Sequence, residues 1–353
     1  MTKGTRIKLI ITAALVLISA ACVIAAVRIS SLLPLEKEYE RWRGDNEMEF
    51  SQVSCFVPES DRLDVTGVNT FRNNMVEGFS KASLDISGKL FVDCYSASGS
   101  CQIATDKANT KASVLAVGGE FFDFHLYEFT DGTYFSENST LSDNVILDEE
   151  LAWFLFGATE VVGSPVNING QVFYVSGVIK REQDFASREA YNGGMGLILP
   201  LASYQNIAED SVYISCYEVV LPNPVRNFAI NLVQEKFPAK NSVIQENTGR
   251  FSFESLIKVI RNSSKRTMSA SVPYPYWENS ARYAESRAAK YLFAALLALL
   301  YPVIFAVSLI VRLFKKAKTK AEDDVLPDIK EKAEEQIRVR QRKRWEKAHP
   351  GQK

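Results

Sequence analysis

Two long stretches without a charged residue stand out in the pattern of hydrophobic and polar positions. Residues 9–27 and residues 291–311 are 19 and 21 residues long, and basic residues flank both of them. A helix of ~20 apolar residues crosses the ~30 Å hydrocarbon core of a bilayer. The pattern therefore predicts two transmembrane helices with a large domain between them.

A cleaved lipoprotein signal is the alternative for the first stretch, because Cys22 follows small residues there. A cleaved signal has a short apolar core that ends at its small-residue exit. Here the apolar residues continue to Val27. A retained anchor is therefore the better interpretation, with Cys22 as a small apolar residue inside the membrane.

The formal net charge of −1 hides a segregation of charge along the chain. Residues 1–28 contain four basic and no acidic residues, residues 312–353 contain 14 basic and eight acidic ones, and the region between is acidic overall. Lys and Arg gather on the cytoplasmic side of membrane spans. We therefore expect a two-pass plasma membrane protein with both termini in the cytoplasm and the acidic middle outside.

The hydrophobic fraction of 46% is enough for a folded core. Together with the apolar stretches and the charge pattern, it defines the expected domain order. The order is a cytoplasmic N-terminus (1–8), a first span (9–27), a stalk (28–50), an extracytoplasmic core domain (51–275), a second stalk (276–290), a second span (291–311) and a basic cytoplasmic tail (312–353).

Residues 112–179 form the most informative stretch of the core domain. Apolar and polar residues alternate over residues 166–168 and 173–175, on either side of Asn169-Gly170. The Asn-Gly dipeptide suits the two-residue type I′ turn of a β-hairpin. The stretch therefore predicts a β-rich unit that contains this hairpin and one short helix.

Two similar strand–helix patterns occur at opposite ends of the core domain. Strand-like residues 53–57 precede a helical face over residues 68–79, and strand-like residues 212–221 precede a second one over residues 225–233. Two such units can close into one sheet as halves of a split domain. We predict an α+β fold, with a mixed α/β ectodomain of split βα units that carries a β-rich insert at about residues 125–190.

Three segments in this order resemble a known family. Residues 132–135 (GTYF), residues 145–157 (VILDEELAWFLFG) and residues 163–178 (GSPVNINGQVFYVSGV) are similar to the extracytoplasmic core domain of MacB/FtsX-type ABC permeases. The resemblance covers the region between the two apolar stretches. A complete permease of this type has three membrane helices after that domain, so the resemblance implies a relative that lacks the last two.

The resemblance implies a role in transport without chemistry in the ectodomain. In such permeases, ATP-driven closure in the cytoplasm is transmitted to this domain through stalk helices. The stalks implied here run from Glu36 to Arg43 and from Glu278 to Lys290. Their charges would pair with a partner, and a separate ABC ATPase subunit and a fuller permease would be the partners, with self-association also open.

Four cysteines lie in the expected ectodomain, where disulfides persist. Cys94 and Cys101 flank a loop-like run of small residues, which predicts a disulfide between them, with two thiols as the alternative. Cys55 and Cys216 occupy matching positions of the two βα units. A second disulfide between them is an open alternative that depends on the spacing of those strands.

No motif for chemistry is present. The sequence has no G-x-x-x-x-G-K-[ST] phosphate loop, and the glycine run at residues 193–196 has the composition of a turn. His125 is the one histidine of the expected ectodomain and falls in an aromatic stretch interpreted as a strand, so we expect no metal, cofactor or catalytic residue. Asp148, Glu149 and Glu150 have the pattern of acids at a helix N-terminus.

The main functional hypothesis is therefore a non-enzymatic accessory component of an ABC-type export or cell-envelope complex. The alternative is a stand-alone membrane sensor or adaptor whose ectodomain binds a peptide, a lipid or an envelope ligand. The charged tail at residues 330–347 predicts a solvated helix beside the membrane, with contact to anionic lipid as the second interpretation. Nucleic-acid binding is not expected.

Overall fold

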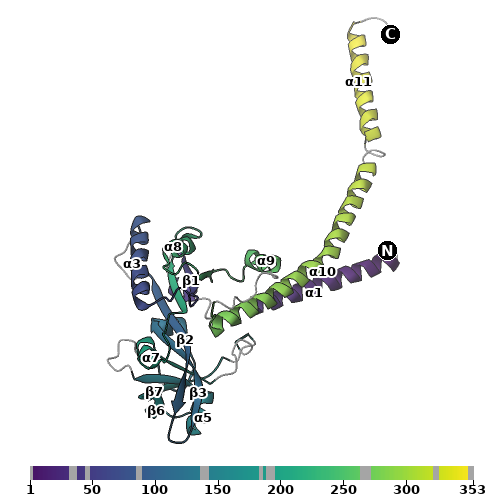
Figure 1. Ribbon diagram of the computed structural model, residues 1–353. Helices are drawn as coiled ribbons and strands as arrows, with labels where there is room; N and C mark the ends of the chain where they lie inside the picture. The colour runs from purple at the N-terminus through teal and green to yellow at the C-terminus, as the bar shows by residue number, and fades with distance from the viewer. Residues whose placement is uncertain are drawn as a thin grey trace. The chain divides into compact units, whose positions relative to one another are not determined.

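The computed structural model describes residues 3–31, 38–43, 48–84, 90–135, 143–182, 186–187, 195–262, 272–320 and 326–348 (Figure 1). The chain falls into two compact units. One unit comprises Met1–Ile24 and Leu292–Lys353, and the other comprises Ala25–Tyr291. The first unit contains most of both apolar stretches, and the second contains the predicted ectodomain.

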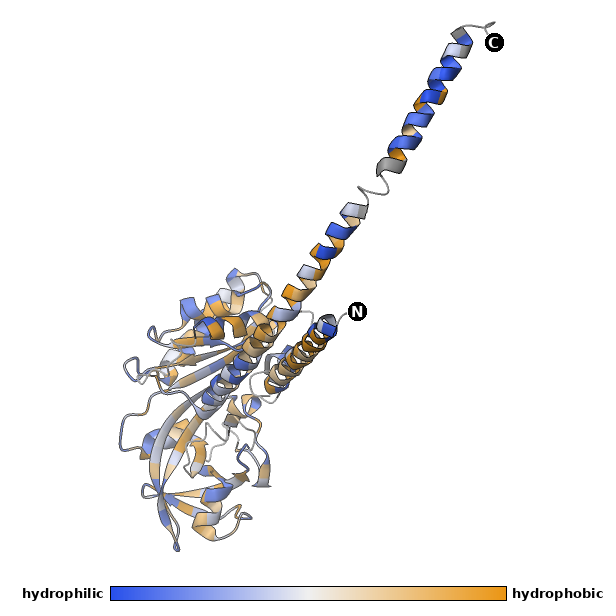
Figure 2. Cartoon of the chain, turned by 90° about the vertical axis from the view of Figure 1, so that its right-hand side faces the viewer, coloured by the Kyte–Doolittle hydropathy of each residue, from blue (hydrophilic) through white to orange (hydrophobic). Residues whose placement is uncertain are grey.

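Three helices contribute to the first unit: α1 (Lys3–Ser30), α10 (Tyr276–Lys320) and α11 (Leu326–Ala348). α1 and α10 are long and apolar enough to cross a membrane, and only 11% of each apolar window is buried. Apolar residues dominate these two helices, whereas α11 is mostly hydrophilic (Figure 2). Pro302 lies inside α10 without ending it, as expected for a proline in a membrane helix.

The second unit is built on a ten-stranded mixed sheet with the order β10-β1-β9-β2-β3-β8-β5-β7-β4, in which β6 pairs with β2 and β7. The long strand β2 joins the two halves of the sheet, because its start pairs with β9 and its end pairs with β6. The strands are β1 (Phe50–Phe56), β2 (Val92–Ala104), β3 (Asn109–Gly119), β4 (Phe129–Gly132), β5 (Asn144–Asp148), β6 (Pro165–Ile168), β7 (Gln171–Ile179), β8 (Gly196–Pro200), β9 (Cys216–Pro222) and β10 (Val243–Glu246).

The shorter helices pack against this sheet. Phe71 on α3 makes edge-on ring contacts with Tyr217 of β9 at 5.4 Å and with Phe237, which follows α8, at 5.1 Å. The predicted apolar face of α3 is confirmed at Phe71 and Met75, although Val76 is exposed. The helices of this unit are α2 (Glu38–Arg43), α3 (Val65–Lys81), α4 (Phe121–Phe124), α5 (Glu149–Phe156), α7 (Leu201–Ile207), α8 (Phe228–Lys236) and α9 (Phe253–Arg261).

The predicted α+β architecture is confirmed. The strands of the two βα units, β1 and β9, are antiparallel neighbours, and α3 and α8, the helices that follow them, pack into the same apolar core. The β-rich part does not form a sheet of its own. Its strands β8, β5, β7 and β4 follow β3 in the same sheet, and β6 pairs with both β7 and β2.

The predicted hairpin is confirmed by β6 and β7. Asn169 and Gly170 connect the two strands with φ angles of 47° and 89°. Both values are positive, as a type I′ turn requires, and an Asn-Gly pair adopts them at low cost. The side chain of Asn167 supports the turn by accepting a hydrogen bond from the Gly170 amide at 2.8 Å.

The predicted Cys94–Cys101 disulfide is wrong and the open alternative, Cys55–Cys216, is not formed either, since all five cysteines, which lie among the described residues, are thiols. Cys94 and Cys101 both belong to β2, so they are separated by roughly 23 Å at ~3.3 Å per residue. Cys55 pairs in register with Tyr217, and Cys216 pairs with Phe56. Cys55 and Cys216 therefore point to opposite faces of the sheet, where no bridge can form.

We expect mass analysis of the denatured protein to find five alkylated cysteines without any reductant. In the native protein, burial raises the pKa of Cys101 to about 11, so at about pH 8 only about 0.1% is thiolate and its alkylation is slow. A Cys94–Cys101 peptide that separates only after reduction would contradict the strand register.

Candidate functional site

The extramembrane part of α10 is docked on the ectodomain. About four turns of this helix belong to the ectodomain unit, which extends to Tyr291. Trp277, Ala281, Ala284 and Ala288 are buried and recur at intervals of three or four residues, so they form one face of the helix. The predicted second stalk is therefore packed on the ectodomain, and its alanines allow a close approach of the backbone.

A buried ion-pair cluster holds the same helix. Arg250, in the loop after β10, donates two hydrogen bonds to the Glu278 carboxylate at 2.7 and 2.8 Å and one to Glu285 at 2.7 Å. The side chains of these three residues are 1–4% exposed. Arg282 also pairs with Glu278 and lies over the Tyr274 ring at 3.9 Å. The fork of an arginine side chain suits such bidentate binding.

A chain of side-chain hydrogen bonds continues from Arg250 into the sheet. Arg250 donates to Asn247 at 3.2 Å, and Asn247 donates to Ser54 of β1 at 2.9 Å. Ser54 donates to Glu218 of β9 at 3.0 Å, and the Glu218 carboxylate lies 2.7 Å from His125 Nε2. Buried polar side chains thus connect two central strands to the helix that continues into the membrane segment.

This arrangement can transmit movement, because every link is buried and hydrogen-bonded. Separating a buried ion pair leaves charges without compensation, at a cost of several kcal/mol. A rotation or tilt of α10 is therefore expected to move the β1–β9 part of the sheet with it. We call this connection, which Arg250, Glu278 and Glu285 make at the start of α10, the joint.

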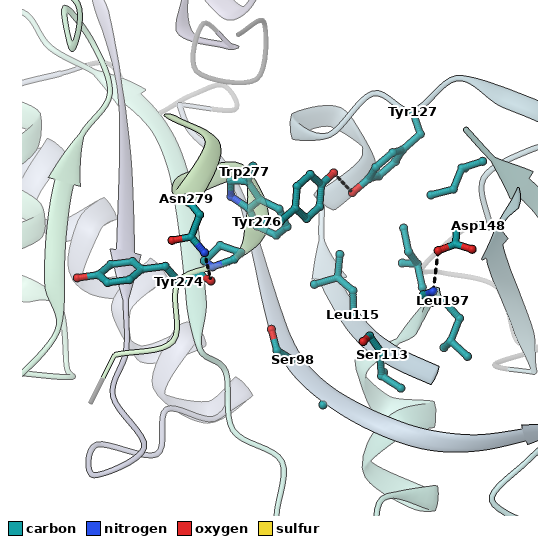
Figure 3. A pocket seen from close by; sticks show the side chains of 16 residues that line it. Ser98, Ser113, Leu115, Tyr127, Asp148, Leu197, Tyr274, Tyr276, Trp277 and Asn279 are labelled. Carbon is teal, nitrogen blue, oxygen red and sulfur yellow. Dashed lines mark hydrogen bonds between the residues drawn. The ribbon is translucent and has the colours of Figure 1, made fainter. Parts of the chain in front are cut away.

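A pocket lies beside the joint, between the start of α10 and strands β2, β3 and β8 (Figure 3). Its volume is about 350 Å³. Tyr276 donates a hydrogen bond to Tyr127 across it at 3.3 Å. Trp277 Nε1 and Asn279 Oδ1 are buried and have no hydrogen-bond partner among the described residues. The remaining lining side chains include Ser98, Ser113, Leu115, Asp148, Leu197 and Tyr274.

The model of a protein family, the MacB-like periplasmic core domain, matches residues 48–231, which is more than half of the chain. The chain belongs to this family. The resemblance of the three sequence segments to the MacB family is therefore confirmed, and the MacB-like domain is the extracytoplasmic part of a membrane protein of the ABC-type transporter family. The match ends before Arg250 and α10.

Solved structures similar to this chain include a periplasmic region and an extracellular domain of other proteins. The periplasmic region of MacB from Actinobacillus actinomycetemcomitans is 17% identical, with a TM-score of 0.42 and coverage of 66% of this chain and 100% of that one. The extracellular domain of the noncanonic ABC-type transporter YknZ from Gram-positive bacteria is 18% identical, with a TM-score of 0.35 and coverage of 55% and 98%. No curated protein matches the chain.

The stalk residues predicted from the sequence do not share one environment in the structure. Glu278 is in the joint, but it pairs with Arg250 of the same chain instead of with a partner. Arg43 forms an exposed ion pair with Glu49 at 2.9 Å, and Lys290 is exposed. Glu36 lies outside the described residues. Of the predicted coupling residues that are described, Glu278 alone therefore belongs to the buried cluster.

The structure also shows the surroundings of His125 and Asp148, two residues that the sequence analysis considered. His125 follows α4 as its C-terminal cap, which corrects the prediction of a strand, and it stacks on Phe121 at 4.3 Å. Asp148 caps α5 by accepting a hydrogen bond from the Leu151 amide at 2.7 Å, as predicted for the acids of that helix start. Asp148 also pairs with Arg181 at 2.7 Å. These contacts assign Asp148 a structural role.

Sequence reasoning missed four members of the polar chain: Ser54, Glu218, Asn247 and Arg250. One signal was present, because Glu218 is a lone acid inside the apolar run of β9. A charged residue within a buried strand needs a partner, so Glu218 could have been predicted to take part in a buried polar contact. The other three have no spacing pattern, since loops and strands bring them together over nearly 200 residues.

Proposed function

We propose that this protein is a non-enzymatic partner component of an ABC-type export or cell-envelope complex. Family membership supports the ABC context. The observation that carries the proposal is the joint, because one continuous helix, α10, contains both the apolar membrane segment and the buried face on the ectodomain. Movement of the membrane segment would reach the ectodomain through Glu278, Glu285 and Arg250.

The proposed topology places both termini in the cytoplasm. The sequence contains no phosphate-binding loop, so the proposal assigns ATP hydrolysis to a separate subunit. A fuller permease would be the membrane partner of α1 and α10. The exposed apolar side chains of these two helices supply surface for lipid or for such a partner.

Crosslinking in native membranes tests the proposal. A photoreactive residue at the exposed position Lys290 should capture a permease, and mild detergent should co-purify an ATP-hydrolysing subunit with it. The matched control carries the photoreactive residue at Lys81, an exposed lysine at the end of α3, which is outside the membrane region. Capture only of copies of this chain or of a signalling protein would contradict the proposal.

A membrane sensor or adaptor is the second candidate, and the pocket beside the joint favours it. Aromatic side chains line the pocket, and two of its lining residues contain a buried polar atom without a hydrogen-bond partner among the described residues, Trp277 Nε1 and Asn279 Oδ1. A peptide, lipid or envelope ligand bound there would contact α10 and the sheet at once. A signalling protein in the crosslinking experiment would support this candidate instead of the first.

A further inference from the structure

Three side chains that can ligate a metal ion, those of Cys94, His125 and Glu218, meet close to Trp277 of α10. Cys94 of β2 and Glu218 of β9 are directly opposite each other in the strand register, and His125 follows α4 above them. One ligand atom from each lies within 4.8 Å of the other two. All three residues are buried, with exposed fractions of 1–3%. Sequence spacing predicts no such site, since 93 residues separate His125 from Glu218.

Two features of this group are unusual for a plain polar contact. His125 Nδ1 is buried and has no hydrogen-bond partner among the described residues. The side-chain partners of the Glu218 carboxylate in the described part of the chain are Ser54 and His125, and neither carries a permanent positive charge. Buried imidazole nitrogens normally have a partner, and buried carboxylates are normally paired or ligate a metal.

We propose that Cys94 Sγ, one imidazole nitrogen of His125 and one carboxylate oxygen of Glu218 bind a zinc-like divalent cation. Thiolate, imidazole and carboxylate form a donor set that zinc accepts, at distances of ~2.0–2.3 Å. Two ligands of a tetrahedral zinc ion lie ~3.3–3.8 Å apart, so the side chains must shift, and the 2.7 Å contact between His125 Nε2 and Glu218 must lengthen if both atoms are ligands. Cys94 releases its proton to the solvent, and the thiolate and carboxylate then neutralise the two charges of the ion.

The proposed metal site is connected to α10 through side-chain contacts on two sides. Glu218 is the residue through which the polar chain reaches Ser54, Asn247 and finally Arg250. On the other side, Trp277 of α10 lies 4.4 Å from the His125 ring, measured between ring centroids. A bound ion would therefore change the contacts of α10 with the sheet, whichever partner the protein has.

Cobalt titration of the full-length protein in detergent tests the proposal. The reduced, metal-free protein should bind one Co²⁺ per chain and develop an intense thiolate-to-cobalt absorption in the near ultraviolet, which Zn²⁺ then abolishes by displacement. Cys94→Ser should lose the band. Glu218→Gln should weaken cobalt binding more than about tenfold, because removal of even an outer-shell partner costs 10–100-fold.

Cys101→Ser is the matched control, since Cys101 is also a buried thiol of β2 but belongs to the core on the other face of the sheet. It should keep the full band and the wild-type affinity. A wild-type protein that binds no cobalt at stoichiometric concentration would overturn the proposal, whether or not the variants fold. A band that survives in a folded Cys94→Ser protein would overturn it as well.

Discussion

Replacing Arg250 by methionine is expected to lower the free energy of unfolding of the ectodomain by about 3–5 kcal/mol. The substitution keeps much of the side-chain volume but leaves Glu278 and Glu285 buried without their shared cation. Uncompensated buried carboxylates are among the costliest defects in a folded protein. Urea unfolding of the full-length protein in detergent, followed by tryptophan fluorescence, measures the change, and the buried Trp277 reports on the joint itself.

Arg226 provides the matched control. It also pairs with a glutamate, Glu254, but these side chains are 82% and 61% exposed. Arg226→Met should therefore change the free energy of unfolding by less than about 1 kcal/mol. Adding Glu278→Met and Glu285→Met to the Arg250 variant should recover most of the loss, because apolar residues replace the whole buried cluster. Equal effects of the Arg250 and Arg226 substitutions would show that the cluster does not stabilise the joint.

Proline at Ala284 is the second substitution with a large expected effect. Proline inside a helix removes one backbone hydrogen bond and clashes with the preceding turn, at a cost of about 3 kcal/mol or more. Ala284 is fully buried, so the kink would also lift the packed face away from the ectodomain. We expect both a lower unfolding midpoint of the ectodomain and loss of the partner captured through position 290.

Glycine at position 284 separates the effect of breaking the helix from the effect of removing the alanine methyl group. Ala284→Gly keeps the backbone hydrogen bond and should cost only about 1 kcal/mol. A stalk that does not pack on the ectodomain would give a different result. In that case Ala284→Pro would abolish partner capture but leave the unfolding midpoint of the ectodomain at the wild-type value.

Local patterns predicted much of the fold. The two apolar helices, the amphipathic face around Phe71 and the Asn169-Gly170 hairpin depend on residues that are close in sequence, so their periodicity is sufficient. The ordered segments between residues 132 and 178 predicted the family for the same reason. These predictions are confirmed.

Local sequence patterns could not predict the contacts between residues that are far apart in the sequence. Cys94 and Cys101 flank small residues that suggested a loop, but β2 runs straight through them, so only the strand register shows that they cannot meet. β9 inserts between β1 and β2, which places Glu218 beside both Ser54 and Cys94. No local spacing encodes that order. The joint and the candidate metal site both depend on it.

Hydrogen exchange of the wild-type protein in lipid nanodiscs tests the docked helix most directly. The account predicts that backbone amides of residues 280–289 exchange as slowly as those of the central strand β9, and that Arg250→Met accelerates them strongly. The exposed helix α11 is the internal reference for a helix without tertiary cover. Wild-type exchange of residues 280–289 as fast as that of α11 would contradict the claim that α10 is joined to the ectodomain.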